Sequence, residues 1–211
     1  MHKVRFRYKK TGRAKYISHL DLMATMQRSF IRAGIGLKYS EGFNPHPYMS
    51  VALPLSVGYE SICELIDIAV LESFIPDINK IEFPEGIEIV DAYNPQRKFS
   101  DITWIEINGK FYYNKQVPEE LLVSINQRLS GNSLIISKRT KRGTNDLDIA
   151  PFVKDFNIKP EDCISFKTKI SAQNPTINAE DLINALEDHQ KPDHFDIRRI
   201  EIYDADMILF R

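Results

Sequence analysis

The sequence has few cysteines and no long apolar run. Its 211 residues include only Cys63 and Cys163, which lie far apart in apolar surroundings, so we expect buried thiols in a reducing compartment rather than a disulfide or a metal site. No run of about eighteen apolar residues occurs, and the N-terminal MHKVRFRYKK lacks the apolar segment of a signal peptide. We therefore expect a cytoplasmic protein that does not cross a membrane.

Common catalytic and cofactor motifs are also missing. The sequence contains no Walker loop and no GxGxxG, HExxH, GxSxG or CxxC motif, so nucleotide hydrolysis, dinucleotide chemistry, an iron–sulfur cluster and acyl-serine catalysis lack their residues. His19 and Asp21 are two residues apart on a predicted helix, a spacing that points them to different sides. We therefore expect no cofactor and no metal.

Charge is unevenly distributed, although the net charge is -1. Residues 1–58 contain 10 Lys/Arg and 2 Asp/Glu, whereas residues 59–96 contain 1 and 9. Residues 97–143 contain 9 Lys/Arg and 4 Asp/Glu, and residues 144–211 contain 8 and 14. Basic and acidic blocks thus alternate twice, which favours a local basic surface for an acidic partner.

The hydrophobic pattern predicts two similar halves, residues 1–96 and residues 97–211, joined near residues 94–101. The first half is predicted to contain strands 3–9, 36–39, 62–71 and 86–92 and helices 19–34 and 72–80. The second is predicted to contain strands 103–107, 133–138, 163–170 and 195–203 and helices 119–129 and 179–186. We therefore predict an α+β fold class with two tandem ferredoxin-like βαββαβ units and antiparallel sheets.

Residues 15–61 combine an amphipathic helix with a loop rich in glycine and proline. Ser18 and Asp21 have capping-box spacing, so the helix is expected to begin near His19. Its exposed side is predicted to carry Arg28 and Arg32. Its buried side is predicted to contain Leu20, Met23, Ala24, Phe30 and Ile31. In strand 3–9, the charged side chains of Arg5, Arg7 and Lys9 are expected on the exposed face.

The loop after this helix contains GFNPHP, in which Asn44 and His46 each precede a proline that favours extended backbone. Tyr39 and Phe43 lie near the basic residues Arg28 and Arg32 in sequence. This mixture is typical of single-stranded RNA binding, in which bases stack on rings and cations contact phosphates. Two alternatives remain. The loop can be a stiff structural turn, and the aromatic rings can belong to the core while the cations are solvated.

Two other basic groups are candidates for phosphate contact. Arg13 and Lys15 precede the predicted helix, and a second group consists of Lys138, Arg139, Lys141 and Arg142. Either group can instead be solvated. If the protein is an enzyme, His19 or His46 is the candidate general base, and Lys15 or Arg28 would stabilise the charged transition state.

Three segments, RFRYKKTGRAKYISHLD, YSEGFNPHP and KRGTNDLDIAPF, resemble the radical-SAM-linked protein family. This is a domain of unknown function fused to, or encoded beside, radical S-adenosylmethionine proteins, often near RNA-processing and ribosomal genes. The resemblance implies a radical S-adenosylmethionine protein as partner, which would hold the radical chemistry because this chain lacks cluster-binding cysteines. We therefore expect an RNA-binding or substrate-presenting accessory protein. A metal-independent RNA-cleaving or RNA-modifying enzyme and a protein–protein adaptor remain alternatives.

Overall fold

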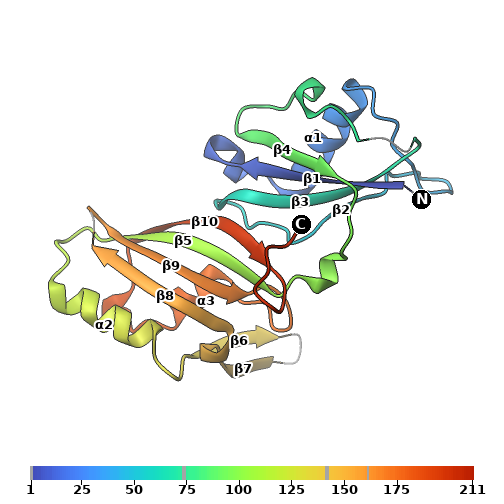
Figure 1. The fold of residues 1–211 in the computed structure, drawn as a ribbon. Coiled ribbons are helices and arrows are strands. Elements are labelled where there is room, and N and C mark those ends of the chain that lie inside the picture. Colours follow the sequence, from blue (N-terminus) through green and yellow to red (C-terminus); the bar gives the residue numbers. More distant parts are fainter. Residues whose placement is uncertain (1, 73–74, 141–142, 161) are drawn as a thin grey trace. The chain divides into compact units, whose positions relative to one another are not determined.

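The computed structural model describes residues 2–72, 75–140, 143–160 and 162–211 (Figure 1). It divides into unit 1, residues 1–101 with Arg211, and unit 2, residues 102–210. Helices and strands occur in both units, and the strand pairs within each unit are antiparallel. The predicted α+β class with antiparallel sheets is therefore confirmed. Among the described residues, no helix is long and apolar enough to span a membrane.

Unit 1 combines a small sheet with one α-helix and short 3-10 helices in the part that the structure describes. In chain order its elements are β1 (His2–Lys10), η1 (Gly12–Tyr16), α1 (His19–Arg32), β2 (Met49–Val51), β3 (Glu60–Val70), η2 (Ile78–Lys80), β4 (Ile87–Tyr93) and η3 (Phe99–Asp101). β1 pairs with both β3 and β4, and β2 pairs with β3. This sheet is the platform on which α1 and the loop after it are placed.

The core of unit 1 lies between α1 and one face of the sheet. Phe6 of β1 and Phe30 of α1 are fully buried, and their ring centroids are 4.8 Å apart. The Ser18 side chain accepts a hydrogen bond from the Asp21 amide at 3.1 Å, so the helix begins where the capping-box spacing predicts. α1 is thereby fixed in position against β1.

Two residues predicted to be buried on α1 are exposed. The buried side of α1 contains Leu22, Met26, Ser29 and Phe30. Leu20 is 79% exposed and Ile31 is 49% exposed. Two residues correspond to more than half a turn of an α-helix, so Leu20 points away from the side that Leu22 buries.

The second face of β1 is buried at Arg5 and Arg7, which contradicts the prediction that these arginines are exposed, whereas Lys9 on the same face is partly exposed. Arg5 is 0% exposed and Arg7 is 9% exposed. The Arg5 guanidinium forms two bonds to the Asp67 carboxylate, at 2.7 and 3.0 Å. It also donates to the Arg97 carbonyl at 2.9 Å and lies 4.3 Å from the centroid of the Phe99 ring. Alternating charge indicated a solvated face, whereas the ion pair with Asp67 across the strands allows Arg5 to be buried.

Two predicted elements of unit 1 differ from the structure. Residues 36–39 contribute only isolated bridges, and the second strand is β2. The predicted helix 72–80 is represented by η2, while residues 73 and 74 lie outside the described residues. Pro76 accounts for part of this difference because proline has no amide hydrogen for an interior helical bond.

Unit 2 contains a four-stranded sheet, a hairpin and two α-helices in its described part. Its elements are β5 (Trp104–Tyr112), α2 (Glu119–Leu129), β6 (Ile135–Thr140), β7 (Gly143–Asp148), η4 (Ala150–Phe152), β8 (Val153–Pro160), β9 (Ile164–Ser171), α3 (Ala179–Asn184), η5 (Asp188–Gln190) and β10 (His194–Tyr203). The strand order is β10-β5-β9-β8, and β6 pairs with β7. Figure 1 shows α2 and α3 on the same face of this sheet.

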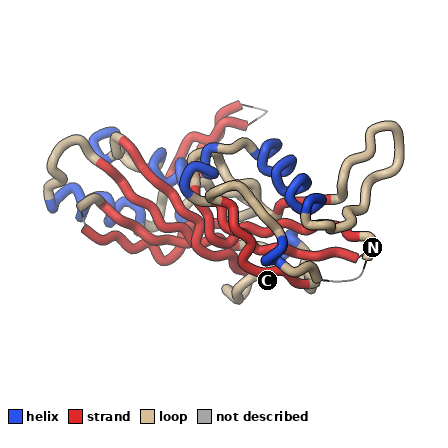
Figure 2. The backbone as a smooth tube through the Cα atoms, turned by 90° about the horizontal axis from the view of Figure 1, so that it is seen from above, coloured by secondary structure: helices blue, strands red, loops and turns tan. Residues whose placement is uncertain are grey.

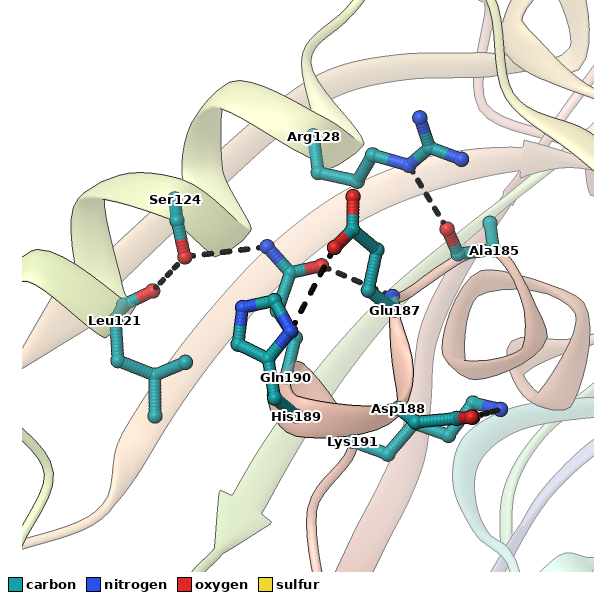
Figure 3. A network of polar contacts seen from close by, with 9 residues as sticks. All are labelled: Leu121, Ser124, Arg128, Ala185, Glu187, Asp188, His189, Gln190 and Lys191. Carbon is teal, nitrogen blue, oxygen red and sulfur yellow. Dashed lines mark hydrogen bonds and ion pairs between the residues drawn. The ribbon is translucent and has the colours of Figure 1, made fainter.

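A polar network joins α2 to the segment after α3 (Figure 3). Arg128 Nε donates to the Ala185 carbonyl at 3.0 Å. Gln190 Nε2 donates to Ser124 Oγ at 3.1 Å, and that hydroxyl donates to the Leu121 carbonyl at 2.9 Å. These bonds satisfy polar groups between neighbouring elements, so the network holds the helical layer of unit 2 together.

Strands β7 and β8 were not predicted, and the segment 133–138 belongs to the hairpin rather than to the sheet. The polar residues of β7 resemble a loop. In β8 the alternation is broken by a bulge between Lys154 and Asn157, where Asp155 has φ of 54°. Unit 1 has a single α-helix among its described residues and unit 2 has an additional hairpin, so two complete βαββαβ units stay a prediction.

Candidate nucleic-acid interface

The loop between α1 and β2 has a paired stem. The Ser40 amide donates to the His46 carbonyl at 2.9 Å, and the Tyr48 amide donates to the Lys38 carbonyl at 2.9 Å. The Ala69 amide of β3 donates to the Tyr48 carbonyl at 2.8 Å. The stem is thereby attached to the sheet, and the rest of the loop projects beyond the strands (Figure 2).

The tip of this loop presents an aromatic ring to solvent. Phe43 has a relative exposure of 111%, which is the highest among the exposed large hydrophobic residues. It follows Gly42, whose φ of 117° favours glycine. Asn44 is also exposed and precedes Pro45, so its backbone conformation is restricted. Phe43 and Asn44 therefore both lie at the surface, as expected, and Phe43 is not part of the core.

Three other residues of the loop extend this surface. Tyr39 is 38% exposed and Tyr48 is 41% exposed. His46 is exposed, and its ring centroid lies 6.5 Å from that of Tyr48. His46 Nδ1 is 3.0 Å from Ser40 Oγ. We name the group Tyr39, Phe43, Asn44, His46 and Tyr48 the loop surface.

A hydrogen bond connects the loop surface to α1. Gln27 Nε2 donates to the Tyr39 hydroxyl at 3.3 Å. The next residue, Arg28, is exposed, and no hydrogen bond or ion pair joins its guanidinium to another side chain in the part of the chain that the structure describes. Arg32 donates to Ser29 Oγ at 3.0 Å and to the Glu82 carbonyl at 3.3 Å. Within the described residues neither arginine is shown in an ion pair with a carboxylate, and Arg28 is the more available of the two.

Arg13 and Lys15 lie in η1, and the buried side chain of Lys10 is bonded to the backbone at and just after this helix. Lys10 is 2% exposed, and its ammonium donates to the Lys15 carbonyl at 3.4 Å and to the Ile17 carbonyl at 3.3 Å. Burial lowers the pKa of Lys10, while the charge of Glu64 acts in the opposite direction. The Lys15 side chain lies over the Tyr16 ring, 5.3 Å from its centroid.

The structure places Arg13 and Lys15 away from the loop surface. The loop stem bonds to the residue that pairs with Lys3 in β1, whereas η1 follows Lys10 at the opposite end of that strand. A strand rises about 3.3 Å per residue, which separates these positions by roughly 20 Å. His19 begins α1 immediately after η1, and no hydrogen bond or ring contact joins it to His46 among the described residues. The two candidate histidines are therefore not brought together.

The basic group predicted in unit 2 is used differently. Lys138 donates to Asp181 Oδ2 at 3.0 Å and to the Thr176 carbonyl at 2.8 Å. Its charge is therefore paired with a carboxylate within the protein, which argues against the predicted phosphate contact. Arg139 lies in β6, and Lys141 and Arg142 lie outside the described residues.

Other site types find little support in the described residues. Cys63 and Cys163 are both free thiols; Cys63 is buried, as predicted, whereas Cys163 is only half-buried. No group of three or more His, Cys, Asp and Glu side chains in the described ranges is arranged to hold a metal ion. Gln27 and Ser40, which position Tyr39 and His46, were not predicted. Gln27 lies outside the three quoted segments, whereas Ser40 lies within YSEGFNPHP. Each becomes relevant only when the loop folds back towards α1 or onto itself.

Comparisons with known proteins identify a family and a related fold. The model of a family described as "Uncharacterized protein conserved in bacteria (DUF2344)" matches residues 3–192. The search of curated proteins found no match. A chain in the crystal structure of a Cbf5-Nop10-Gar1 complex is similar, with 9% identity and a TM-score of 0.53 over 94% of this chain and 48% of that one. Our chain thus spans about half the length of that relative, and the likeness concerns the fold alone.

A second solved structure, Thermus thermophilus Cse3 bound to an RNA representing a pre-cleavage complex, has 11% identity and a TM-score of 0.21. This match covers 93% of our chain and 99% of that one. A TM-score of this size does not establish a common fold. The functional argument therefore depends on the surface of unit 1.

Proposed function

The chain belongs to the DUF2344 family of uncharacterized bacterial proteins, and we propose that it is a cytoplasmic protein that binds single-stranded RNA and presents it to a radical S-adenosylmethionine enzyme. The observation that carries the RNA proposal is the fully exposed Phe43 ring on a loop with a paired stem. An exposed aromatic ring on a supported loop offers a flat apolar surface, and nucleic-acid bases stack on such rings.

The charge around the loop surface supports a nucleic-acid partner. Arg28 follows the residue that bonds Tyr39, and Lys38 belongs to the loop stem and is exposed. These cations are suited to phosphate groups of an RNA strand whose bases stack on Phe43. A protein partner that bound this surface would have to be acidic to match these cations.

Single-stranded RNA fits this surface better than duplex RNA. Bases in an A-form duplex are stacked on one another, and the deep major groove is closed to side chains. A single ring projecting from a loop reaches a base only where that base is unpaired. The rings of Tyr39 and Tyr48 are about two-fifths exposed and could contact further bases or ribose groups.

The radical S-adenosylmethionine partner is a separate part of the proposal. It is supported by the resemblance of YSEGFNPHP and KRGTNDLDIAPF to the radical-SAM-linked family. In this arrangement the partner supplies the radical chemistry, and this chain supplies the RNA-binding surface.

The finer fold assignment, two tandem ferredoxin-like units, is supported by the strand pairing, which is antiparallel and follows the same order in both units. In unit 1, β1 lies between β3 and β4, and in unit 2, β5 lies between β9 and β10.

RNA binding is tested by gel mobility shift with a single-stranded RNA of about 12 nucleotides and with the same strand in a duplex. We expect a shift with the single strand and a weaker one with the duplex. Equal shifts, or no shift with either RNA, would contradict the proposal. The enzyme alternative predicts cleavage or modification of the RNA that is lost in His46→Ala, whereas our proposal predicts intact RNA with both proteins.

The partner is tested separately by mixing the purified chain with a radical S-adenosylmethionine protein from the same bacterium and measuring complex formation by size-exclusion chromatography. A stable complex supports the accessory role. RNA binding without complex formation would leave the chain as an RNA-binding protein and remove the partner. A complex without RNA binding would favour the adaptor alternative.

A further inference from the structure

Ser40 contacts the same histidine twice. Its Oγ accepts a hydrogen bond from the His46 amide at 3.0 Å and lies 3.0 Å from His46 Nδ1. The backbone closes the stem at the same place, because the Ser40 amide donates to the His46 carbonyl at 2.9 Å. Three contacts between two residues therefore fix the position of the imidazole ring relative to the loop stem.

The hydroxyl contacts favour one tautomer of His46. A serine hydroxyl has one hydrogen to donate and two lone pairs. Since one lone pair already accepts the His46 amide, donation of the hydroxyl hydrogen to Nδ1 satisfies both groups. The opposite arrangement would leave the Ser40 hydrogen without an acceptor among the described residues. In the part of the chain that the structure describes, the other group near Nδ1 is the Asn44 carbonyl, at 3.5 Å, which is too long for a strong bond.

The remaining ring nitrogen then carries the hydrogen. Nδ1 and Nε2 are separated by Cε1, and their bonding directions diverge widely in the plane of the ring, so Nε2 points away from Ser40. His46 is exposed, and the Tyr48 ring stands beside it at a centroid distance of 6.5 Å. A neutral histidine in this state offers an N–H donor to a ligand at the loop surface.

We propose that Ser40 is a positioning residue that holds His46 in the Nε2–H tautomer, so that Nε2 donates a hydrogen bond to an acceptor of the bound RNA, either a phosphate oxygen or a base atom. The inference rests on the proposed RNA binding. It adds a donor of fixed direction to a surface whose other contacts, stacking on Phe43 and charge from Arg28, carry little sequence information.

The tautomer is tested in the free protein, without RNA, by long-range ¹H–¹⁵N NMR at about pH 8, where an imidazole is neutral. We expect His46 to be mainly the Nε2–H form. Ser40→Ala should move it towards a mixture of tautomers, and Ser40→Thr should restore it because threonine keeps the hydroxyl. An Nδ1–H form in the unmodified protein, or no change in Ser40→Ala, would overturn the positioning role.

The RNA contact is tested by fluorescence anisotropy with a single-stranded RNA and with an abasic strand of the same length. Ser40→Ala and His46→Ala should each weaken RNA binding by about threefold to tenfold, and the double variant should weaken it no further. Equal losses on both strands identify a phosphate acceptor, and a loss confined to the strand with bases identifies a base acceptor. Additive losses would overturn the coupling between the two residues.

Ser50→Ala is the matched control, because Ser50 is exposed in β2 and has no role in the loop surface. Circular dichroism of each variant checks that the fold is kept. If the unmodified protein binds no RNA, the proposed function and the RNA contact both fail, while the NMR result still decides whether Ser40 sets the tautomer. The two failures are therefore distinguishable.

Discussion

Arg28 in unit 1 and Lys138 in unit 2 show how differently two predicted phosphate-binding residues are used. Arg28 is exposed beside the residue that bonds Tyr39. Lys138 is bonded to Asp181 and to the Thr176 carbonyl. Both lie in basic stretches of the sequence, so local charge alone does not identify a binding surface. What distinguishes them is whether the protein itself already supplies the opposite charge.

The largest effect that we expect concerns the buried ion pair of Arg5 and Asp67, in which a basic residue stabilises the fold. Asp67→Ala removes the carboxylate and leaves the fully buried Arg5 guanidinium without its counter-charge. We expect the free energy of unfolding to fall by about 3–5 kcal/mol. Urea denaturation followed by circular dichroism measures this loss.

Glu88→Ala is the matched control for this change, because Glu88 forms an exposed ion pair with Lys9 at 3.1 Å. Exposed pairs contribute about 0–1 kcal/mol, so this variant should remain close to the unmodified protein in stability. Similar losses in the two variants would contradict the structural role assigned to Arg5.

The next largest effect concerns the loop surface. Phe43→Ala should weaken binding of single-stranded RNA by about 1–3 kcal/mol, because it removes one stacking platform. The melting temperature should not change, since the Phe43 ring is exposed and does not pack in the protein core. Leu20→Ala, which alters an exposed side chain on α1, should leave RNA affinity unchanged. Equal effects of the two substitutions on affinity would show that the loop surface has no special role.

A smaller effect separates Arg28 from Lys138 directly. Arg28→Gln should weaken RNA binding and lower the slope of affinity against salt concentration by about one unit, because one phosphate contact is lost. Lys138→Gln should instead lower the melting temperature while the salt slope stays the same. Anisotropy titrations at several salt concentrations and thermal melts test both variants. The reverse outcome would exchange the roles of the two residues.

The smallest effect concerns Tyr113 in unit 2, whose hydroxyl donates to the Gln190 carbonyl at 2.7 Å. Burial raises the pKa of Tyr113 to about 12, above the value of about 10 for an unfolded tyrosine. The stability linked to this shift is complete below about pH 10 and is lost as the pH rises through the folded pKa. Tyr113→Phe should remove this part of the alkaline loss, as urea denaturation across that pH range would show. An unchanged alkaline profile would contradict the shift.

Local sequence signals predicted the helices well where they were strong. The capping-box spacing of Ser18 and Asp21 placed the start of α1, and α2 has the predicted bounds, Glu119–Leu129. The exposed loop was recognised from its glycine and proline residues, because these determine backbone conformation locally. The major strands β3, β4 and β10 were found within a few residues of their observed ends.

Features that depend on distant residues were not predictable from the sequence. The burial of Arg5 depends on Asp67, 62 positions away, and the pairing of Lys138 depends on Asp181, 43 positions away. The strand β8 was missed because its bulge interrupts the alternation of apolar and polar side chains. The contacts between Ser40 and His46 likewise form only when the stem of the loop is closed. Charge and hydropathy patterns report the local chain, whereas these contacts depend on the folded structure.

The most direct test of RNA binding at the loop surface is photo-crosslinking with a single-stranded RNA that contains 4-thiouridine, followed by mass spectrometry of the attached peptides. We predict that the main crosslinked peptide contains Phe43 together with Tyr39 or Tyr48, and that the crosslink is lost in Phe43→Ala. Crosslinks confined to unit 2, or an unchanged crosslink yield in Phe43→Ala, would contradict the assignment of the RNA-binding surface to this loop.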